Sequence, residues 1–136
     1  MKSEMGGMVE DVRRFHEAVG GRVAEGFTPR VLRSRRRFIE EEAQEALAAL
    51  CEAEDQATLG DVSTESRRHL VQELIDLTYV IMGTFAELGL DPMPAWRAVH
   101  EANMRKEPSP SGGKAIKPAG WQPPEIPLVE LKGIRT

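Results

Sequence analysis

The sequence is poor in cysteine and aromatic residues, and it contains no long hydrophobic run. Its one cysteine, Cys51, excludes an internal disulfide and a zinc site built from several cysteines. Four Phe, two Trp and one Tyr leave aliphatic residues and Met to fill the core, which favours helices over sheets. No apolar stretch reaches the length of a membrane span or a signal-peptide core. We therefore expect a cytoplasmic protein that does not bind membranes.

The chain also lacks an excess of positive charge. Its net charge of −4 argues against general nucleic-acid binding, which needs a basic surface. A length of 136 residues, with 40% hydrophobic and 29% charged residues, is typical of a soluble globular protein with one modest core.

Hydrophobic spacing predicts four helices with short connections, near residues 10–19, 30–57, 65–88 and 92–106. Thr28 fits the start of the second helix, Ser63 or Thr64 that of the third, and Gly89 the end of the third. The third helix is apolar nearly all round from Leu70 onward, so we expect it to be central and buried. Together these helices predict an all-α fold, an antiparallel bundle of four to five helices.

The second helix carries an apolar stripe that we expect to face the core, consisting of Leu32, Phe38, Ile39, Ala43, Leu47, Leu50 and Cys51. After Lys106 the sequence becomes rich in proline and glycine. This change divides the chain into a helical domain, residues 1–106, and an irregular tail, residues 107–136, that packs on the bundle or closes over the site.

Acidic residues interrupt the most hydrophobic part of the third helix. Glu73 and Asp76 are three residues apart and project from one face. Burial of unpaired carboxylates costs several kcal/mol each, so a positive charge must compensate. In the second helix, Glu42 and Glu45 have the same spacing, with Glu41 beside them. If the two helices pack antiparallel, these carboxylates converge on an oxygen-rich site that suits Mg²⁺ or Mn²⁺.

A simpler interpretation is that the glutamates form a solvated helix face. Arg36 and Arg37 lie four residues before Glu40 and Glu41, so ion pairs within the helix are available. These pairs explain Glu40 but not the acids of the third helix. A buried arginine–carboxylate cluster is the remaining alternative to a metal.

The motif E-E-x-x-E at Glu41–Glu45, followed by E-x-x-D at Glu73–Asp76, resembles the signature of MazG-like, all-α nucleoside triphosphate pyrophosphohydrolases. The segment "VHEANMRK" resembles the family's asparagine-and-lysine segment, here Asn103 and Lys106. The tail "GGKAIKPAGWQPPEI" is similar to the ending of small, phosphoribosyl-ATP pyrophosphohydrolase-like members. The resemblance covers roughly residues 15–126.

The resemblance implies a dimeric or tetrameric helical bundle whose active sites use more than one subunit. It also implies Mg²⁺-dependent cleavage of a nucleoside triphosphate between the α and β phosphates, and small members act on deoxynucleotides, including dUTP. Phosphoribosyl-ATP pyrophosphohydrolysis in histidine synthesis is a second possibility. A helical scaffold or regulatory protein whose acids bind basic partners is a third, of another class.

On this hypothesis, Glu42, Glu45, Glu73 and Asp76 hold a first Mg²⁺, and Glu41 with Glu45 helps to hold a second. Glu41 or Glu42 is the candidate base that activates water. Seven further residues are candidates for contacts with the substrate or its phosphates, and each has a structural role as the alternative. They are Arg33, Tyr79, Asn103, Lys106, Lys114, Lys117 and Trp121. His16 and His100 lack a zinc-ligand spacing and are interpreted as packing or surface residues.

Overall fold

The computed structural model describes residues 4–132 and contains four helices in that range. They are α1 (Glu4–Ala18), α2 (Pro29–Leu59), α3 (Thr64–Leu88) and α4 (Pro92–Met104). The predicted all-α class is therefore confirmed. Among the described residues, no helix combines the length and hydrophobicity needed to cross a membrane.

Local sequence signals set the helix ends. The Thr28 hydroxyl accepts a hydrogen bond from the Val31 amide at 3.2 Å, which caps α2. Ser63 caps α3 in the same way, and Gly89 ends α3 in the left-handed conformation with a φ of 75°. The first helix begins about two turns earlier than predicted, and α4 ends at Met104 rather than at Lys106.

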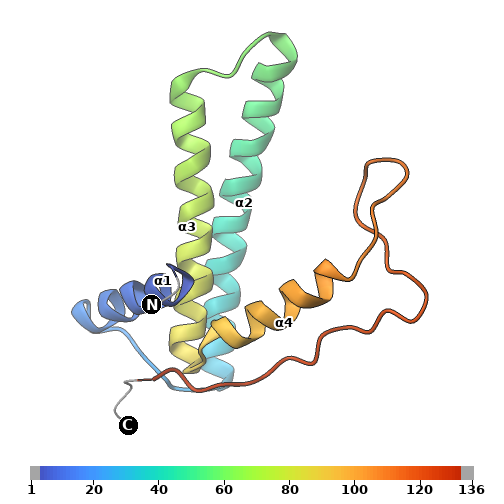
Figure 1. Cartoon of the computed structure of the whole chain (residues 1–136). Coiled ribbons are helices and arrows are strands. Elements are labelled where there is room, and N and C mark those ends of the chain that lie inside the picture. The colour runs from blue at the N-terminus through green and yellow to red at the C-terminus, as the bar shows by residue number, and fades with distance from the viewer. Residues whose placement is uncertain (1–3, 133–136) are drawn as a thin grey trace.

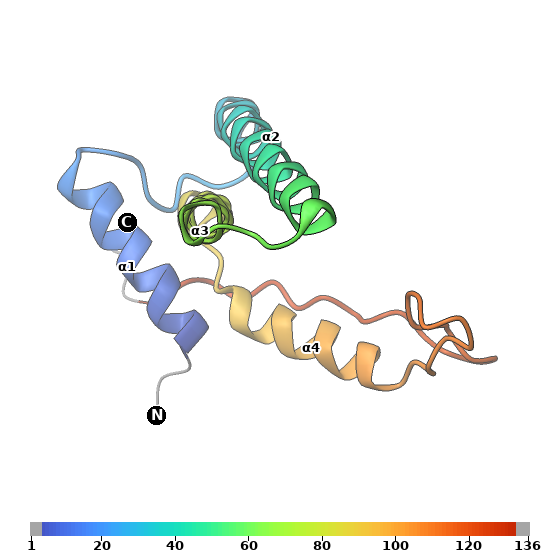
Figure 2. The same ribbon diagram turned by 90° about the horizontal axis from the view of Figure 1, so that it is seen from above.

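Helices α2 and α3 form a long antiparallel hairpin (Figure 1), and they make the most extensive contact between any two helices. Helix α1 crosses α3 near the base of this hairpin. Helix α4 starts at the same base and runs outward on another side, as the view from above also shows (Figure 2). The far half of the hairpin therefore projects beyond the other helices of the chain.

The core is small and lies near the base of the hairpin. Val9 and Val12 of α1 are buried against Met82 of α3, with Phe85 and Leu131 packed around them. Between α2 and α3 the buried residues of α2 include Ala46 and Ala49. Small side chains allow the two helix axes to approach closely.

The predicted core stripe of α2 is consequently wrong in several positions. Leu47 and Leu50 are 61% and 42% exposed, and Cys51 is exposed rather than part of the core. The face turned toward α3 is the one that carries Ala46 and Ala49, because α3 is the main neighbour that the single chain provides.

The expectation of a fully buried α3 is also wrong for the single chain. Val71 and Ile75 are 60% and 57% exposed, and even Tyr79 remains 38% exposed. The reason is that α1 covers only the C-terminal part of α3, where Met82 and Ala86 are buried.

The tail returns along α4 to the base of the hairpin (Figures 1 and 2). The Trp121 indole N–H donates to the Ala102 carbonyl of α4 at 2.7 Å. Near its end, the Asp91 amide donates to the Val129 carbonyl at 2.7 Å, and the Leu131 amide to the Gly89 carbonyl at 2.9 Å. These contacts fix the tail to α4 and to the α3–α4 connection.

Candidate active site

Three carboxylates from α2 and α3 converge in the middle of the hairpin. Glu42, Glu73 and Asp76 each offer an oxygen atom, and these atoms lie within 4.8 Å of one another. Glu73 and Asp76 share a face of α3 because they are three residues apart, and the antiparallel pairing places Glu42 opposite them. We call these three residues the acid cluster.

Two oxygens of the acid cluster are buried without a partner. Glu42 Oε2 and Glu73 Oε2 are inaccessible to solvent and accept no hydrogen bond. Burial raises the pKa of Glu42 above its ordinary value, and the nearby charges of Glu45 and Asp76 raise it further. Burial also raises the pKa of Glu73, with a further contribution from Glu45. Glu45 thus borders the cluster, although it is itself exposed.

No arginine or lysine within residues 4–132 neutralises the acid cluster. His69 Nδ1 lies 3.7 Å from Glu73 Oε1, and among the described side chains no arginine or lysine forms an ion pair with these three acids. The alternative of an arginine–carboxylate cluster therefore finds no support at this site. The intrahelical pairs available to Glu40 and Glu41 do not form either, and Glu40 is exposed as expected.

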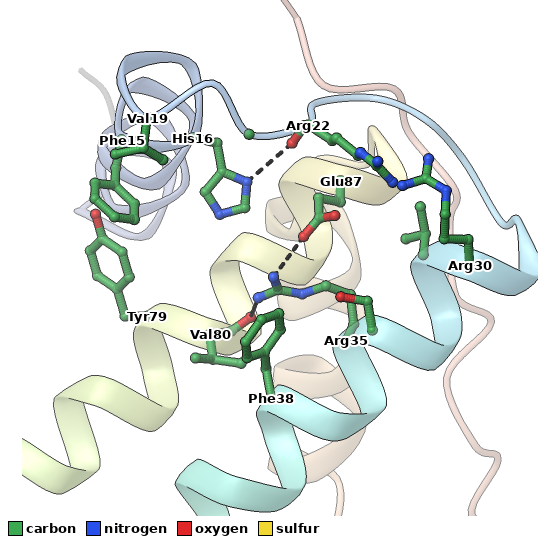
Figure 3. A pocket seen from close by; sticks show the side chains of 13 residues that line it. Phe15, His16, Val19, Arg22, Arg30, Arg35, Phe38, Tyr79, Val80 and Glu87 are labelled. Carbon is green, nitrogen blue, oxygen red and sulfur yellow. Dashed lines mark hydrogen bonds and ion pairs between the residues drawn. The ribbon is translucent and has the colours of Figure 1, made fainter.

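A cavity of about 560 Å³ opens between α1, α2 and α3 (Figure 3). Its aromatic walls are Phe15, Phe38 and Tyr79, and the Phe15 and Tyr79 rings meet edge to face with centroids 5.7 Å apart. Phe38 precedes Glu42 by about one helical turn, and Tyr79 follows Asp76 by the same interval. This aromatic cavity therefore adjoins the acids along both helices.

A buried ion pair forms the inner wall of the aromatic cavity. Arg35 donates to Glu87 Oε2 at 2.6 Å, to the Val80 carbonyl at 2.8 Å and to the Thr84 hydroxyl at 3.1 Å (Figure 3). The sequence analysis did not identify the Arg35–Glu87 pair. The sequence did contain one signal for this pair, because Glu87 is a third acidic residue in the apolar helix. Nearby, His16 Nδ1 lies 3.1 Å from the Arg22 carbonyl oxygen.

A second, more polar cavity of about 270 Å³ lies on the N-terminal half of α2, and we call it the basic pocket. Its lining consists of Arg30, Arg33, Ser34, Arg37, Phe38 and Glu41. Two residues that the sequence assigned to the site, Glu41 and Arg33, are thus brought together here, whereas Glu41 is not part of the acid cluster.

The remaining predicted substrate residues lie on α4 and the tail. The Lys106 and Lys117 ammonium groups lie 5.3 Å and 5.1 Å from the centre of the Trp121 ring, within the range of cation–π contacts. Lys114 and Asn103 are exposed. Because α4 runs outward from the base of the hairpin in both views, its C-terminal end lies apart from the middle of α2 and α3 (Figures 1 and 2).

Comparisons with known proteins agree with this geometry. The phosphoribosyl-ATP pyrophosphohydrolase family model matches residues 12–103, which include the acid cluster and every residue that lines the aromatic cavity. No curated protein sequence gives a significant match. Because the matched region covers well over half of the chain, the protein belongs to the phosphoribosyl-ATP pyrophosphohydrolase family and is a hydrolase that acts on the phosphoric anhydride bond of a nucleotide-like substrate.

Proposed function

We propose that the protein is a Mg²⁺-dependent nucleoside triphosphate pyrophosphohydrolase that cleaves a deoxynucleotide such as dUTP between its α and β phosphates. The observation that carries this proposal is the acid cluster, with two buried and unpartnered carboxylate oxygens, at the edge of an aromatic cavity. Nucleotide-pool housekeeping is the corresponding role. Residues 1–106 would form the catalytic helical domain and residues 107–136 its tail.

The acid cluster fits a divalent cation that prefers oxygen ligands. Three carboxylate oxygens within 4.8 Å of one another repel each other unless a cation lies between them. The unpartnered Oε2 atoms of Glu42 and Glu73 are acceptors for which no described residue supplies a donor. We assign Glu42, Glu45, Glu73 and Asp76 to a first Mg²⁺, for which Mn²⁺ is a possible substitute, and we assign Glu41 with Glu45 to a second.

The aromatic cavity supports a nucleotide as the substrate. Its volume of about 560 Å³ is in the range of ordinary small-molecule sites. Phe15, Phe38 and Tyr79 offer apolar surfaces for a base or a sugar, one helical turn from the acids. With the base held there, the phosphates would extend toward the acid cluster.

Cleavage then needs a water molecule in line with the bond that breaks. A divalent cation held by the acids would neutralise phosphate charge and lower the pKa of that water. Glu41 or Glu42 accepts the proton while the water oxygen forms a bond to the α-phosphorus. The bond from the α-phosphorus to the bridging oxygen breaks, and pyrophosphate leaves with the electron pair. The products are a nucleoside monophosphate, pyrophosphate and a proton.

We further propose that α4 and the tail serve the active site of a second copy of the chain. Within one chain, Asn103, Lys106, Lys114, Lys117 and Trp121 lie on an arm directed away from the hairpin. The exposed apolar faces of the hairpin, such as Val71 and Ile75, offer a surface for association into a homodimer or homotetramer. In such an assembly the lysines and Asn103 would contact phosphates or the sugar.

A second candidate substrate is phosphoribosyl-ATP, favoured by the description of the matching family. It contains the same bond, so the acid cluster suits it equally well. Which of the two substrates the protein prefers therefore depends on the base that fits the aromatic cavity.

A substrate panel tests both candidates. The purified chain is incubated with dNTPs, NTPs and phosphoribosyl-ATP, with Mg²⁺ or with a chelator, and the pyrophosphate and monophosphate are quantified. We expect pyrophosphate release that requires Mg²⁺ and is fastest with a deoxynucleotide. Preference for phosphoribosyl-ATP would support the alternative. If no compound released pyrophosphate, both candidate substrates would be contradicted and the interpretation as a scaffold protein would be favoured.

Variants connect the activity to the acids. Glu73→Gln or Asp76→Asn should abolish pyrophosphate release, a loss of about two orders of magnitude or more, while the helical circular-dichroism spectrum is retained. Glu40→Gln removes the same charge at a neighbouring exposed site and should leave the rate unchanged.

A further inference from the structure

The basic pocket gathers positive charge on one face of α2. Arg30, Arg33 and Arg37 line it together with Ser34, Phe38 and Glu41. Residues three or four positions apart project from the same side of a helix, which explains why Arg33, Arg37 and Glu41 share this pocket. Three arginines and one glutamate therefore line a space of about 270 Å³.

Two of these arginines have no anionic partner within the part of the chain that the structure describes. Arg30 pairs with Glu25 at 2.5 Å, whereas Arg33 and Arg37 form no ion pair or hydrogen bond with any described residue. Arg37 and Glu41 are four residues apart, yet their side chains do not pair. Like charges one turn apart repel each other, so an anion bound between Arg33 and Arg37 would relieve that repulsion.

The basic pocket adjoins both parts of the proposed nucleotide site. It shares Arg30, Ser34 and Phe38 with the aromatic cavity. It also contains Glu41, which directly precedes Glu42 of the acid cluster. The basic pocket is therefore continuous with the aromatic cavity, and it approaches the acid cluster along α2 through Glu41.

We propose that the basic pocket is a diphosphate subsite, which holds the β and γ phosphates of the substrate and then the pyrophosphate that leaves. This inference rests on the proposed cleavage between the α and β phosphates. Arg33 and Arg37 are about 6 Å apart along the helix axis, and each guanidinium can bind one phosphoryl group through two parallel hydrogen bonds. A monophosphate engages only one of them.

The subsite has a defined task in the reaction. When the bond to the α-phosphorus breaks, the electron pair remains on the bridging oxygen, and negative charge grows on the pyrophosphate. Arg33 and Arg37 stabilise that charge as it forms. They also set which bond is cleaved, because a nucleotide anchored through both terminal phosphates presents its α-phosphorus to the acid cluster. The Ser34 hydroxyl, at the junction of the two cavities, is a further donor.

Binding of inorganic pyrophosphate measures this subsite without catalysis. Titration calorimetry of the full chain with pyrophosphate, orthophosphate and dUMP, each in Mg²⁺, compares the wild type with Arg33→Gln and Arg37→Gln. We expect the wild type to bind pyrophosphate more tightly than orthophosphate. Each variant should weaken pyrophosphate binding about tenfold, the value of one charge-assisted hydrogen bond, and leave dUMP binding unchanged.

Arg36→Gln is the matched control, because Arg36 is an exposed neighbour that lines neither cavity and carries the same charge. Its pyrophosphate affinity should equal that of the wild type. If all three variants bound pyrophosphate equally weakly, the effect would be one of general electrostatics. If Arg33→Gln and Arg37→Gln bound pyrophosphate as tightly as the wild type, pyrophosphate would bind elsewhere. Either result overturns the subsite.

The same measurements separate this inference from the proposed function. If the wild type binds pyrophosphate through Arg33 and Arg37 but cleaves no nucleotide, the subsite stands and the proposed activity fails. If nucleotides are cleaved and product inhibition by pyrophosphate is identical in Arg33→Gln and Arg37→Gln, the activity stands and the subsite fails.

Discussion

Two carboxylate oxygens, Glu42 Oε2 and Glu73 Oε2, are buried at an energetic cost that no hydrogen bond from residues 4–132 offsets. A buried carboxylate without a hydrogen bond loses its hydration, and its neighbours in the acid cluster add repulsion. The chain accepts this cost in the middle of its longest helix pair. A bound cation reverses it, so the stability of the protein should depend on Mg²⁺ and on pH together.

The raised pKa values of Glu42 and Glu73 give this dependence a sign. A group whose pKa is higher in the folded state holds its proton more tightly there, so the free energy of unfolding falls as the pH rises through the raised pKa values. We expect Mg²⁺ to raise the Tm more at about pH 8 than at about pH 5.5, because a larger fraction of both carboxyls is ionised at the higher pH. Thermal denaturation with Mg²⁺ or chelator at each pH measures the difference.

Glu73→Gln provides the control for this measurement, because the amide cannot ionise and is a poor cation ligand. Its Tm should respond less to Mg²⁺ at both pH values. A wild-type protein whose Tm rises equally with Mg²⁺ at the two pH values would contradict the link between the buried carboxylates and the cation.

At the scale of secondary-structure elements, Gly83 of α3 lies where three helices meet. A Cβ atom at this position would lie 2.9 Å from Arg35 Nη2 of α2, 3.0 Å from His16 Nε2 of α1 and 3.3 Å from Val12 Cγ1. The Arg35 guanidinium cannot simply move aside, because its hydrogen bonds to Glu87 and the Val80 carbonyl fix it. The absence of a side chain therefore permits the buried ion pair and the packing of α1.

Gly83→Ala should lower the free energy of unfolding by about 1–3 kcal/mol, the usual cost of overpacking a core. Gly7→Ala is the matched control, since it makes the same change inside α1, where an added Cβ meets nothing within 4 Å. Its stability should stay the same or rise by up to about 1 kcal/mol. Urea denaturation compares the two variants, and equal stability of both would contradict the close packing at Gly83.

Sequence reasoning reached the features of these elements that depend on local signals. The caps at Thr28 and Ser63 and the end at Gly89 follow from short-range chemistry. The convergence of α2 and α3 acids followed from helix periodicity plus one assumption, antiparallel packing, which the hairpin satisfies.

The features that sequence reasoning missed depend on which surfaces meet. Arg35 and Glu87 are 52 positions apart, so no local pattern connects them. Cys51 has helical spacing compatible with a core position, but α3 packs on the neighbouring face that carries Ala46 and Ala49. The aromatic cavity required the placement of α1 against the hairpin, which periodicity does not provide.

For the whole molecule, the projecting hairpin exposes large apolar side chains on both of its helices. Leu47 on α2 and Val71 and Ile75 on α3 are each more than half exposed. Exposed apolar surface of this kind marks an association face. The proposed sharing of active sites between copies gives this face a functional reason.

Ile75→Lys should convert the proposed dimer into monomers, because a buried lysine without a partner opposes association. Leu59→Lys is the control: Leu59 is 91% exposed at the tip of the hairpin, so its replacement should leave the assembly intact. Sedimentation velocity of the wild type and both variants gives the mass of each. A monomeric wild type at micromolar concentration would contradict the association face.

The arm formed by α4 and the tail is tied to the molecule at both of its ends. Its first residues follow Gly89, and its last described residues return to the same place through Asp91–Val129 and Gly89–Leu131 hydrogen bonds. A closed loop samples far fewer conformations than a free terminus of equal length. The lysines near Trp121 therefore have less conformational freedom than lysines on a free terminus would have. A ligand that binds them loses less free energy in ordering them.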